Sequence, residues 1–288
     1  MESLFDAPEG SPGASAYDIG YQFLRQIFDQ GLAVTLYNSL SHEDPVMPHQ
    51  RTLLKLLDGY LQALPSSSPV HSSYALSMPR LYTSLASKTY ESIKSSLSGD
   101  GTNFTPDPHL PVLSEALVLA AQCCQLLLLR ESETILKDGE TSIYRAMEQE
   151  TSDGEGCIEL TIDILRELSV LLPRIAMGKA VPVPLSKTRP PTETDPTEFP
   201  YLKRDLIRLL GTLAYQNRTV QDRIRQRGGI QMVMNHCMID ERNPYLREHA
   251  IFALRNLLEH NIENQDVVRE MKPLRGFDAE GILRDMAE

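Results

Sequence analysis

The feature that most constrains this chain is an ungapped internal repeat near its C-terminal end. The stretch that begins at Pro200 matches the stretch that begins at Pro244, so equivalent residues are 44 positions apart. Such a match is hard to obtain by chance in so short a window, and it predicts two structural units of the same kind. The identical pairs are Pro200/Pro244, Tyr201/Tyr245, Leu202/Leu246, Ile207/Ile251, Leu210/Leu254, Leu213/Leu257, Asn217/Asn261, Gln221/Gln265, Asp222/Asp266 and Arg225/Arg269.

A repeat of roughly 40–47 residues is typical of helical solenoids of the HEAT and armadillo type. Each copy predicts a long amphipathic helix that starts at its proline, because the missing amide hydrogen costs nothing there. We expect this helix to end near Asn217 or Asn261 and to be followed by a short polar helix. In the first copy Gly228 and Gly229 permit a sharp turn before a third helix. Since one such unit cannot cover its own apolar face, neighbouring units must stack.

The rest of the chain also has its apolar residues at helical spacing. The segments Leu53–Leu64 and Ile158–Ile175 each carry one apolar stripe, whereas Leu113–Leu129 is apolar on most sides and must be buried on most sides. No sustained alternation of apolar and polar residues predicts a sheet. We therefore expect an all-α, armadillo/HEAT-like helical-repeat superhelix, which we extend to the N-terminal part by inference.

A proline-rich stretch divides the chain into two helical parts. Six prolines between Gly178 and Pro200 favour an extended linker or surface loop, because proline fixes φ and removes a backbone donor. The predicted organisation is an N-terminal helical region of degenerate repeats over 1–177, a linker over 178–199 and a C-terminal armadillo-like domain over 200–288.

The composition narrows the class of partner. The chain has 28 Lys+Arg against 39 Asp+Glu and a formal net charge of -11, which disfavours nucleic acid and anionic membrane surfaces. The N-terminal residues lack the pattern of a secretory signal, and we expect no run near the roughly 18 apolar residues that span a bilayer. Four cysteines without a C-x-x-C pair indicate a reducing compartment.

The sequence contains no familiar catalytic motif, so we predict a protein that is not an enzyme and binds no cofactor. His236, Cys237 and His249 fit no zinc-binding spacing, and we expect them to pack in the core or an interface. Cys123 and Cys124 lie in the most apolar segment, where a thiol behaves as a small hydrophobe. A hydrolase or transferase with an unfamiliar site is an alternative, recognisable by a pocket that gathers titratable groups.

The repeat region resembles the C-terminal domain of the ataxin-10 family, over Phe199 to Glu288. Its most specific string is Asp-x-x-Asn-Pro-Tyr, followed by Ala-Ile-x-Ala-Leu-Arg-Asn-Leu. The resemblance implies armadillo-like repeats in a cytoplasmic protein that acts through partners, with roles around cytokinesis and cell survival. Members of the family are often longer. The stretches that carry the resemblance are Asp205-Leu-Ile-Arg-Leu-Leu-Gly-Thr-Leu, Gln221-Asp, Gly228-Gly-Ile and Ile239 to Gln265.

Polar residues on the two long repeat helices are the candidates for partner binding. Asn256 looks like the asparagine on the concave face of an armadillo helix, but Thr212 occupies its place in the first copy. The alternative for Asn256 is a hydrogen bond to the backbone of a neighbouring repeat. The candidate residues are Arg204, Arg208, Thr212, Arg247, Arg255 and Asn256.

The first copy is also locally basic. Between Pro200 and Gly229, seven basic residues oppose two acidic ones. One interpretation is a surface for an acidic or phosphorylated partner. The other is an ordinary solvated face, or one that pairs with the acidic stretch from Glu131 to Glu167. Ser11, Ser68 and Thr105 precede prolines in predicted loops and are candidate phosphorylation sites.

The favoured function is a non-catalytic protein–protein interaction scaffold of the ataxin-10 type, with proteins rather than nucleic acid or membranes as partners. The alternative is an armadillo-type transport adaptor that binds basic peptides. The net charge of -11 suits such an adaptor. However, the chain has no tryptophan, and these adaptors hold lysine stems between tryptophan rings.

Overall fold

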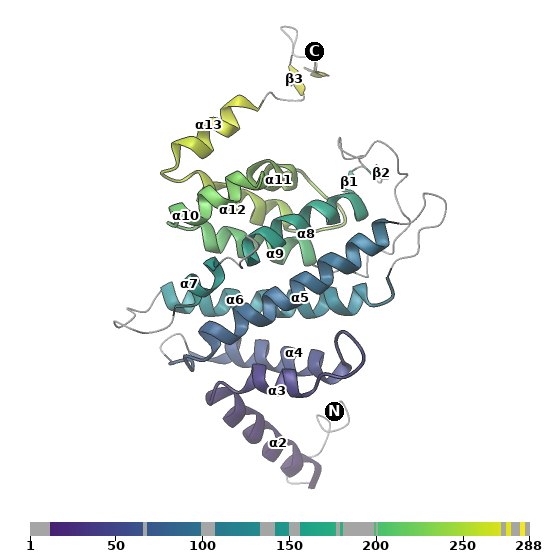
Figure 1. Cartoon of the computed structure of the whole chain (residues 1–288), viewed down its shortest axis with the longest axis vertical. Coiled ribbons are helices and arrows are strands. Elements are labelled where there is room, and N and C mark those ends of the chain that lie inside the picture. The colour runs from purple at the N-terminus through teal and green to yellow at the C-terminus, as the bar shows by residue number, and fades with distance from the viewer. Residues whose placement is uncertain are drawn as a thin grey trace.

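The structure is a computed structural model that describes residues 12–65, 68–98, 107–132, 142–149, 156–176, 179–180, 199, 201–271, 275–277 and 283–285. These residues form an all-α helical-repeat fold, as predicted, in which the helices are stacked along the long axis (Figure 1). The helices are α2 (Pro12–Asp29), α3 (Ala33–Ser39), α4 (Pro48–Ala63), α5 (Tyr74–Leu97), α6 (Leu110–Ser132), α7 (Ile143–Glu148), α8 (Cys157–Leu171), α9 (Leu202–Ala214), α10 (Arg218–Gln226), α11 (Gly229–His236), α12 (Leu246–Leu258) and α13 (Ile262–Glu270).

Two small antiparallel strand pairs accompany the helices without forming a sheet layer. Strand β1 (Ile175–Ala176) pairs with β2 (Lys179–Ala180), and β3 (Arg275–Phe277) pairs with β4 (Leu283–Asp285). The central residue pair of the second hairpin joins Gly276 to Arg284.

The helices form two layers. In the first layer α4, α6, α9 and α12 lie side by side in that order, and in the second layer α5, α8 and α11 do the same. Helices α5, α8 and α11 pack against α6, α9 and α12 of the first layer. The two layers begin at α4 and α5, well before the recognisable repeat. The N-terminal helices therefore belong to the same stack as the C-terminal repeats.

The hydrophobic core is continuous from the N-terminal half into the C-terminal repeats. Helix α6 packs directly on α9, and the buried Gln125 donates a 2.9 Å hydrogen bond from Nε2 to the carbonyl oxygen of Asp205. Most of the predicted linker, 178–199, lies outside the described residues. The domain boundaries therefore stay a prediction, but the two parts that they separate share one core.

Helix α6 is the central core helix. Cys123 and Cys124 are completely buried in it, which confirms their predicted place in the core, and burial raises the pKa of both thiols. Among the described residues, Leu110–Glu131 is long and apolar enough to span a membrane, which corrects our expectation that no run approaches that length. Because 67% of its apolar window is buried inside the structure, α6 fits a core helix.

The two repeats have nearly the same backbone at both ends of their long helices. Tyr201 and Tyr245 precede the long helices with φ of 69° and 65°, and Gln216 and His260 follow them with φ of 51° and 54°. Helices α9 and α12 begin at Leu202 and Leu246, so Pro244 lies before its helix rather than at the first position, while Pro200 lies outside the described residues.

The repeated asparagines begin helices instead of ending them, which corrects the sequence prediction. The side chain of Asn217 accepts a hydrogen bond from the amide of Val220, and that of Asn261 accepts one from the amide of Asn264. Asparagine suits this position because its oxygen satisfies an amide that has no partner within the helix. The predicted glycine turn is present, with Gly228 at a φ of 72°.

Candidate protein interface

The side of the first layer that faces away from the second carries aromatic and arginine side chains. Tyr201, Arg204 and Arg208 share one face of α9, because residues three, four and seven apart lie above one another on a helix. Tyr201 is 49% exposed, while Arg204 and Arg208 are half-buried. On α12 the equivalent positions include Tyr245 and Phe252, which are 70% and 43% exposed. We call these five residues the α9–α12 surface.

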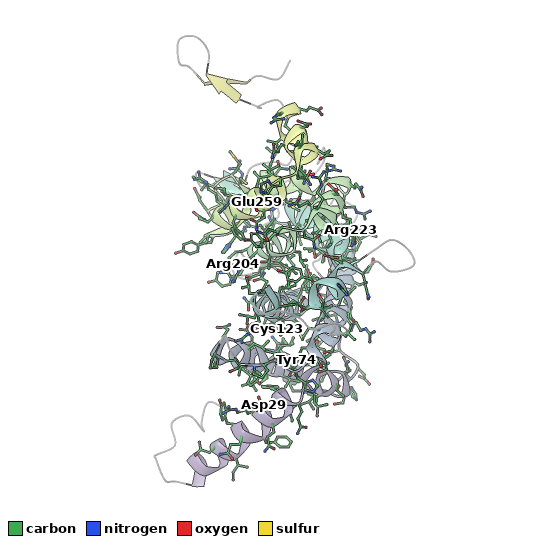
Figure 2. The ribbon with its side chains drawn as sticks, turned by 90° about the vertical axis from the view of Figure 1, so that its left-hand side faces the viewer. Asp29, Tyr74, Cys123, Arg204, Arg223 and Glu259 are labelled. Atoms are coloured by element: carbon green, nitrogen blue, oxygen red, sulfur yellow. The ribbon has the colours of Figure 1, made fainter. Side chains whose placement is uncertain are left out.

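Arg204 is held in place by two neighbours. Its guanidinium carbon lies 4.1 Å from the centre of the Tyr201 ring, and its Nη2 lies 2.8 Å from Oδ2 of the buried Asp205. Asp205 also accepts a 3.2 Å hydrogen bond from Gln122 of α6. The buried Nε of Arg204 has no hydrogen-bond partner. Figure 2 places Arg204 on the side of the stack opposite Arg223.

Arg208 carries the uncompensated charge of the α9–α12 surface. Among the described residues it forms no ion pair. Burial lowers the pKa of the neighbouring His249, and the positive charges of Arg208 and Arg204 lower that pKa further. The carboxylates of Asp205 and Glu248 oppose this shift of the pKa without cancelling it.

Two of the predicted contact residues are buried. The hydroxyl of Thr212 donates a 3.0 Å hydrogen bond to the carbonyl oxygen of Arg208 in its own helix. Nδ2 of Asn256 donates a 2.8 Å hydrogen bond to the carbonyl oxygen of Gly211 in the adjacent α9. This geometry fits the alternative that we gave for Asn256, a bond to the backbone of the neighbouring repeat. A partner that docks on the surface reaches neither side chain.

The other two predicted contacts, Arg247 and Arg255, are exposed on α12. Neither forms an ion pair with a described residue. With the half-buried Arg204 and Arg208, four of the six candidates are accessible to a partner. They fall on two sides of the C-terminal repeats, since Arg247 and Arg255 lie on the outer side of α12.

Two other basic residues of the first copy, Arg223 and Arg227, face the acidic stretch, as the second interpretation of the basic segment predicts, whereas Arg218 and Arg225 pair with Asp222 of their own helix. Arg223 of α10 makes a bidentate pair with Glu159 of α8, at 2.8 Å and 2.7 Å, and both side chains are nearly buried. Arg227, which directly follows α10, pairs with Asp163 of α8. Salt bridges thus join α8 to α10 across the predicted domain boundary. Sequence reasoning named the acidic stretch but not these two carboxylates.

Lys203 and His236 belong to a second buried polar group. The burial of His236 confirms its predicted packing, whereas sequence reasoning did not identify the burial of Lys203. The ammonium of Lys203 donates to the carbonyl oxygen of Leu172 at the end of α8, and burial lowers the pKa of this lysine to about 8. Nδ1 of His236 lies 2.8 Å from the carbonyl oxygen of Met232, and burial lowers the pKa of the histidine to about 4. The part of the chain that the structure describes holds no group of three His, Cys, Asp or Glu residues suited to a metal ion.

Of the three candidate phosphorylation sites, Ser68 lies in the described loop between α4 and α5 and is half-buried. Its amide donates a 2.9 Å hydrogen bond to the carbonyl oxygen of Pro65. Ser11 and Thr105 lie outside the described residues.

Residues 202–287 match the family model of the Spinocerebellar ataxia type 10 protein domain. Over 84 residues the chain is 46% identical to Ataxin-10 homolog from Dictyostelium discoideum and 40% identical to Ataxin-10 from Xenopus tropicalis. Over 70 residues it is 41% identical to Ataxin-10 from Homo sapiens. These matches take in 29%, 29% and 24% of this chain but only 14%, 17% and 15% of the three relatives. No solved structure matches the chain.

Proposed function

We propose that this chain, whose residues 202–287 match the ataxin-10 domain model, is a non-catalytic scaffold for protein–protein interactions. The observation that carries the proposal is the α9–α12 surface, which combines exposed aromatic side chains with Arg208, an arginine that forms no ion pair with a described residue. Tyrosine and arginine are enriched at the energetic centres of protein interfaces. The helices beneath this surface are joined by one core, so it is rigid before a partner arrives.

The cellular role that we propose follows from the family resemblance. It is a cytoplasmic role in the regulation of cytokinesis or of cell survival, exercised through partner proteins. The relatives that match are much longer than the matched segment. The domain therefore supplies one interaction module of such a function.

The alternative, an adaptor for basic peptides, is disfavoured by the charge of the same surface. Arg208 lacks a carboxylate partner among the described residues, and Arg204 lies within a few residues of it on the same helix face. A lysine-rich peptide would meet like charges there. A fluorescence-anisotropy titration with a basic localisation peptide tests this alternative, and tight binding would favour the adaptor.

The proposal is tested by affinity purification of the full chain followed by mass spectrometry. We expect specific partner proteins to be recovered and Arg208→Ala to reduce their recovery about tenfold, since truncating a central interface residue costs on the order of 1–2 kcal/mol. Arg80→Ala provides the matched control, because Arg80 is an exposed arginine on α5 in the second layer. Recovery of no protein above background contradicts the scaffold function.

A further inference from the structure

The outer face of α12 is equivalent to a face of α9 that is completely buried. Ile207 and Leu210 of α9 have no exposed surface. Their equivalents in the next repeat are Ile251, which is 48% exposed, and Leu254, which is half-buried. The difference arises because α9 is followed in the first layer by α12, whereas α12 is the last helix of that layer that the structure describes. An apolar stripe suited to packing therefore lies open.

Two arginines flank this stripe. Arg247 and Arg255 are exposed, and neither forms an ion pair with a described residue. In the preceding repeat their positions are held by the buried Lys203 and by Gly211. The end of the stack thus exposes two guanidinium groups, where the internal interface has one buried ammonium group and a glycine. We call the set Arg247, Ile251, Leu254, Arg255 and Leu258 the end face.

The end face does not suit a further repeat of the same kind. A Cβ atom on Gly211 would lie 2.9 Å from both Cα and Cβ of Ala253, so α9 and α12 can cross this closely only because residue 211 has no side chain. Arg255 stands at the equivalent position in α12. An occupant of the end face must lie farther out, where it meets the guanidinium group.

We infer that the end face binds an acidic amphipathic helix of a partner protein. A helix fits because the equivalent face of α9 is itself covered by a helix, with apolar side chains packed along a stripe. Carboxylates on either side of the partner's stripe would lie against the two unpaired arginines, and guanidinium groups bind carboxylates with good geometry. The inference rests on the proposed scaffold function and specifies the chemistry of one partner.

A second copy of the chain is a poorer occupant on electrostatic grounds. Two end faces brought together would each contribute two unpaired arginines, and like charges across an interface weaken association. Self-association is therefore an outcome that the experiment must detect.

The probe is a synthetic helical peptide with leucines at positions i, i+3, i+4 and i+7 and glutamates beside them, titrated against the full chain by fluorescence anisotropy. A matched peptide carries lysines in place of the glutamates. We expect the glutamate peptide to bind at least about tenfold more tightly, as two exposed ion pairs allow. In the double variant Arg247→Glu with Arg255→Glu this preference reverses. Arg80→Glu, on a different face, changes neither affinity.

Two outcomes overturn the inference. One is equal binding of both peptides, or no binding of the glutamate peptide by the unaltered chain. The other is self-association in sedimentation that Ile251→Asp abolishes while the peptides fail to bind, which assigns the end face to a second copy. Both charge substitutions are at exposed positions, so folding is retained and circular dichroism verifies it. Partner recovery that depends on Arg208 tests the scaffold function separately, since Arg208 is outside the end face.

Discussion

The two repeats of this chain have the same local structure and different surroundings. Their junctions share left-handed tyrosines and asparagine caps, yet Ile207 is fully buried in the first copy and its counterpart Ile251 is 48% exposed in the second. We therefore expect identical residues at equivalent helix positions to contribute differently to stability. The neighbour that stacks on a repeat, rather than the repeat itself, decides which of its residues are core.

The largest expected effect comes from truncating the repeated isoleucine in each copy. Ile207→Ala should destabilise the chain by about 3–4 kcal/mol, because it removes fully buried methyl groups and leaves a cavity. Ile251→Ala should cost less than about 1 kcal/mol, since the site is already half open to solvent. Urea unfolding measures both. Equal losses would contradict the difference between the repeats.

The close crossing of α9 and α12 is tested at Gly211. Gly211→Ala should destabilise by about 2 kcal/mol, because its new Cβ would lie 2.9 Å from the backbone of Ala253. Gly59→Ala is the matched control within α4, where a Cβ meets nothing within 4 Å. That substitution should be neutral or stabilising by up to about 1 kcal/mol. If Gly211→Ala behaves like the control in thermal unfolding, the helices are not in close contact.

The pH dependence of folding stability tests the burial of Lys203, whose counterpart in the second repeat, Arg247, is exposed. Burial lowers the pKa of Lys203 to about 8, so between pH 8 and its ordinary value of 10.5 the unfolded chain binds more protons than the folded chain. Its contribution to stability is therefore present above pH 10.5 and is lost as the pH falls toward 8. Relative to Lys203→Met, the unaltered chain should gain about 2 kcal/mol between pH 8 and pH 10. Parallel stability curves for the two proteins would show that the lysine titrates normally.

The smallest effect concerns the asparagine that joins the repeats. Asn256→Ala should destabilise by about 1–2 kcal/mol, since it leaves the carbonyl oxygen of Gly211 without this buried donor. Partner recovery from the folded variant should be unchanged, because Asn256 is buried. A loss of partners without a loss of stability would instead support direct recognition by this side chain.

Sequence reasoning found four accessible candidate residues but could not tell them from two buried ones. Asn256 and Arg255 are neighbours with polar side chains, yet one points into α9 and the other toward solvent. Charge counting likewise placed Arg223 and Arg208 in one basic segment. The structure separates them, because Arg223 reaches Glu159 on α8 while Arg208 reaches no described carboxylate.

The sequence by itself determined the helical class, the 44-residue unit and the turn at Gly228, because these follow from hydrophobic spacing and from local backbone chemistry. Only the tertiary structure decided that Ile207 is buried and Ile251 is not. It likewise decided that Arg223 is neutralised by an ion pair and that Lys203 is desolvated. Burial and ion pairing depend on distances between helices that are far apart along the chain, and those distances are set by how the layers stack.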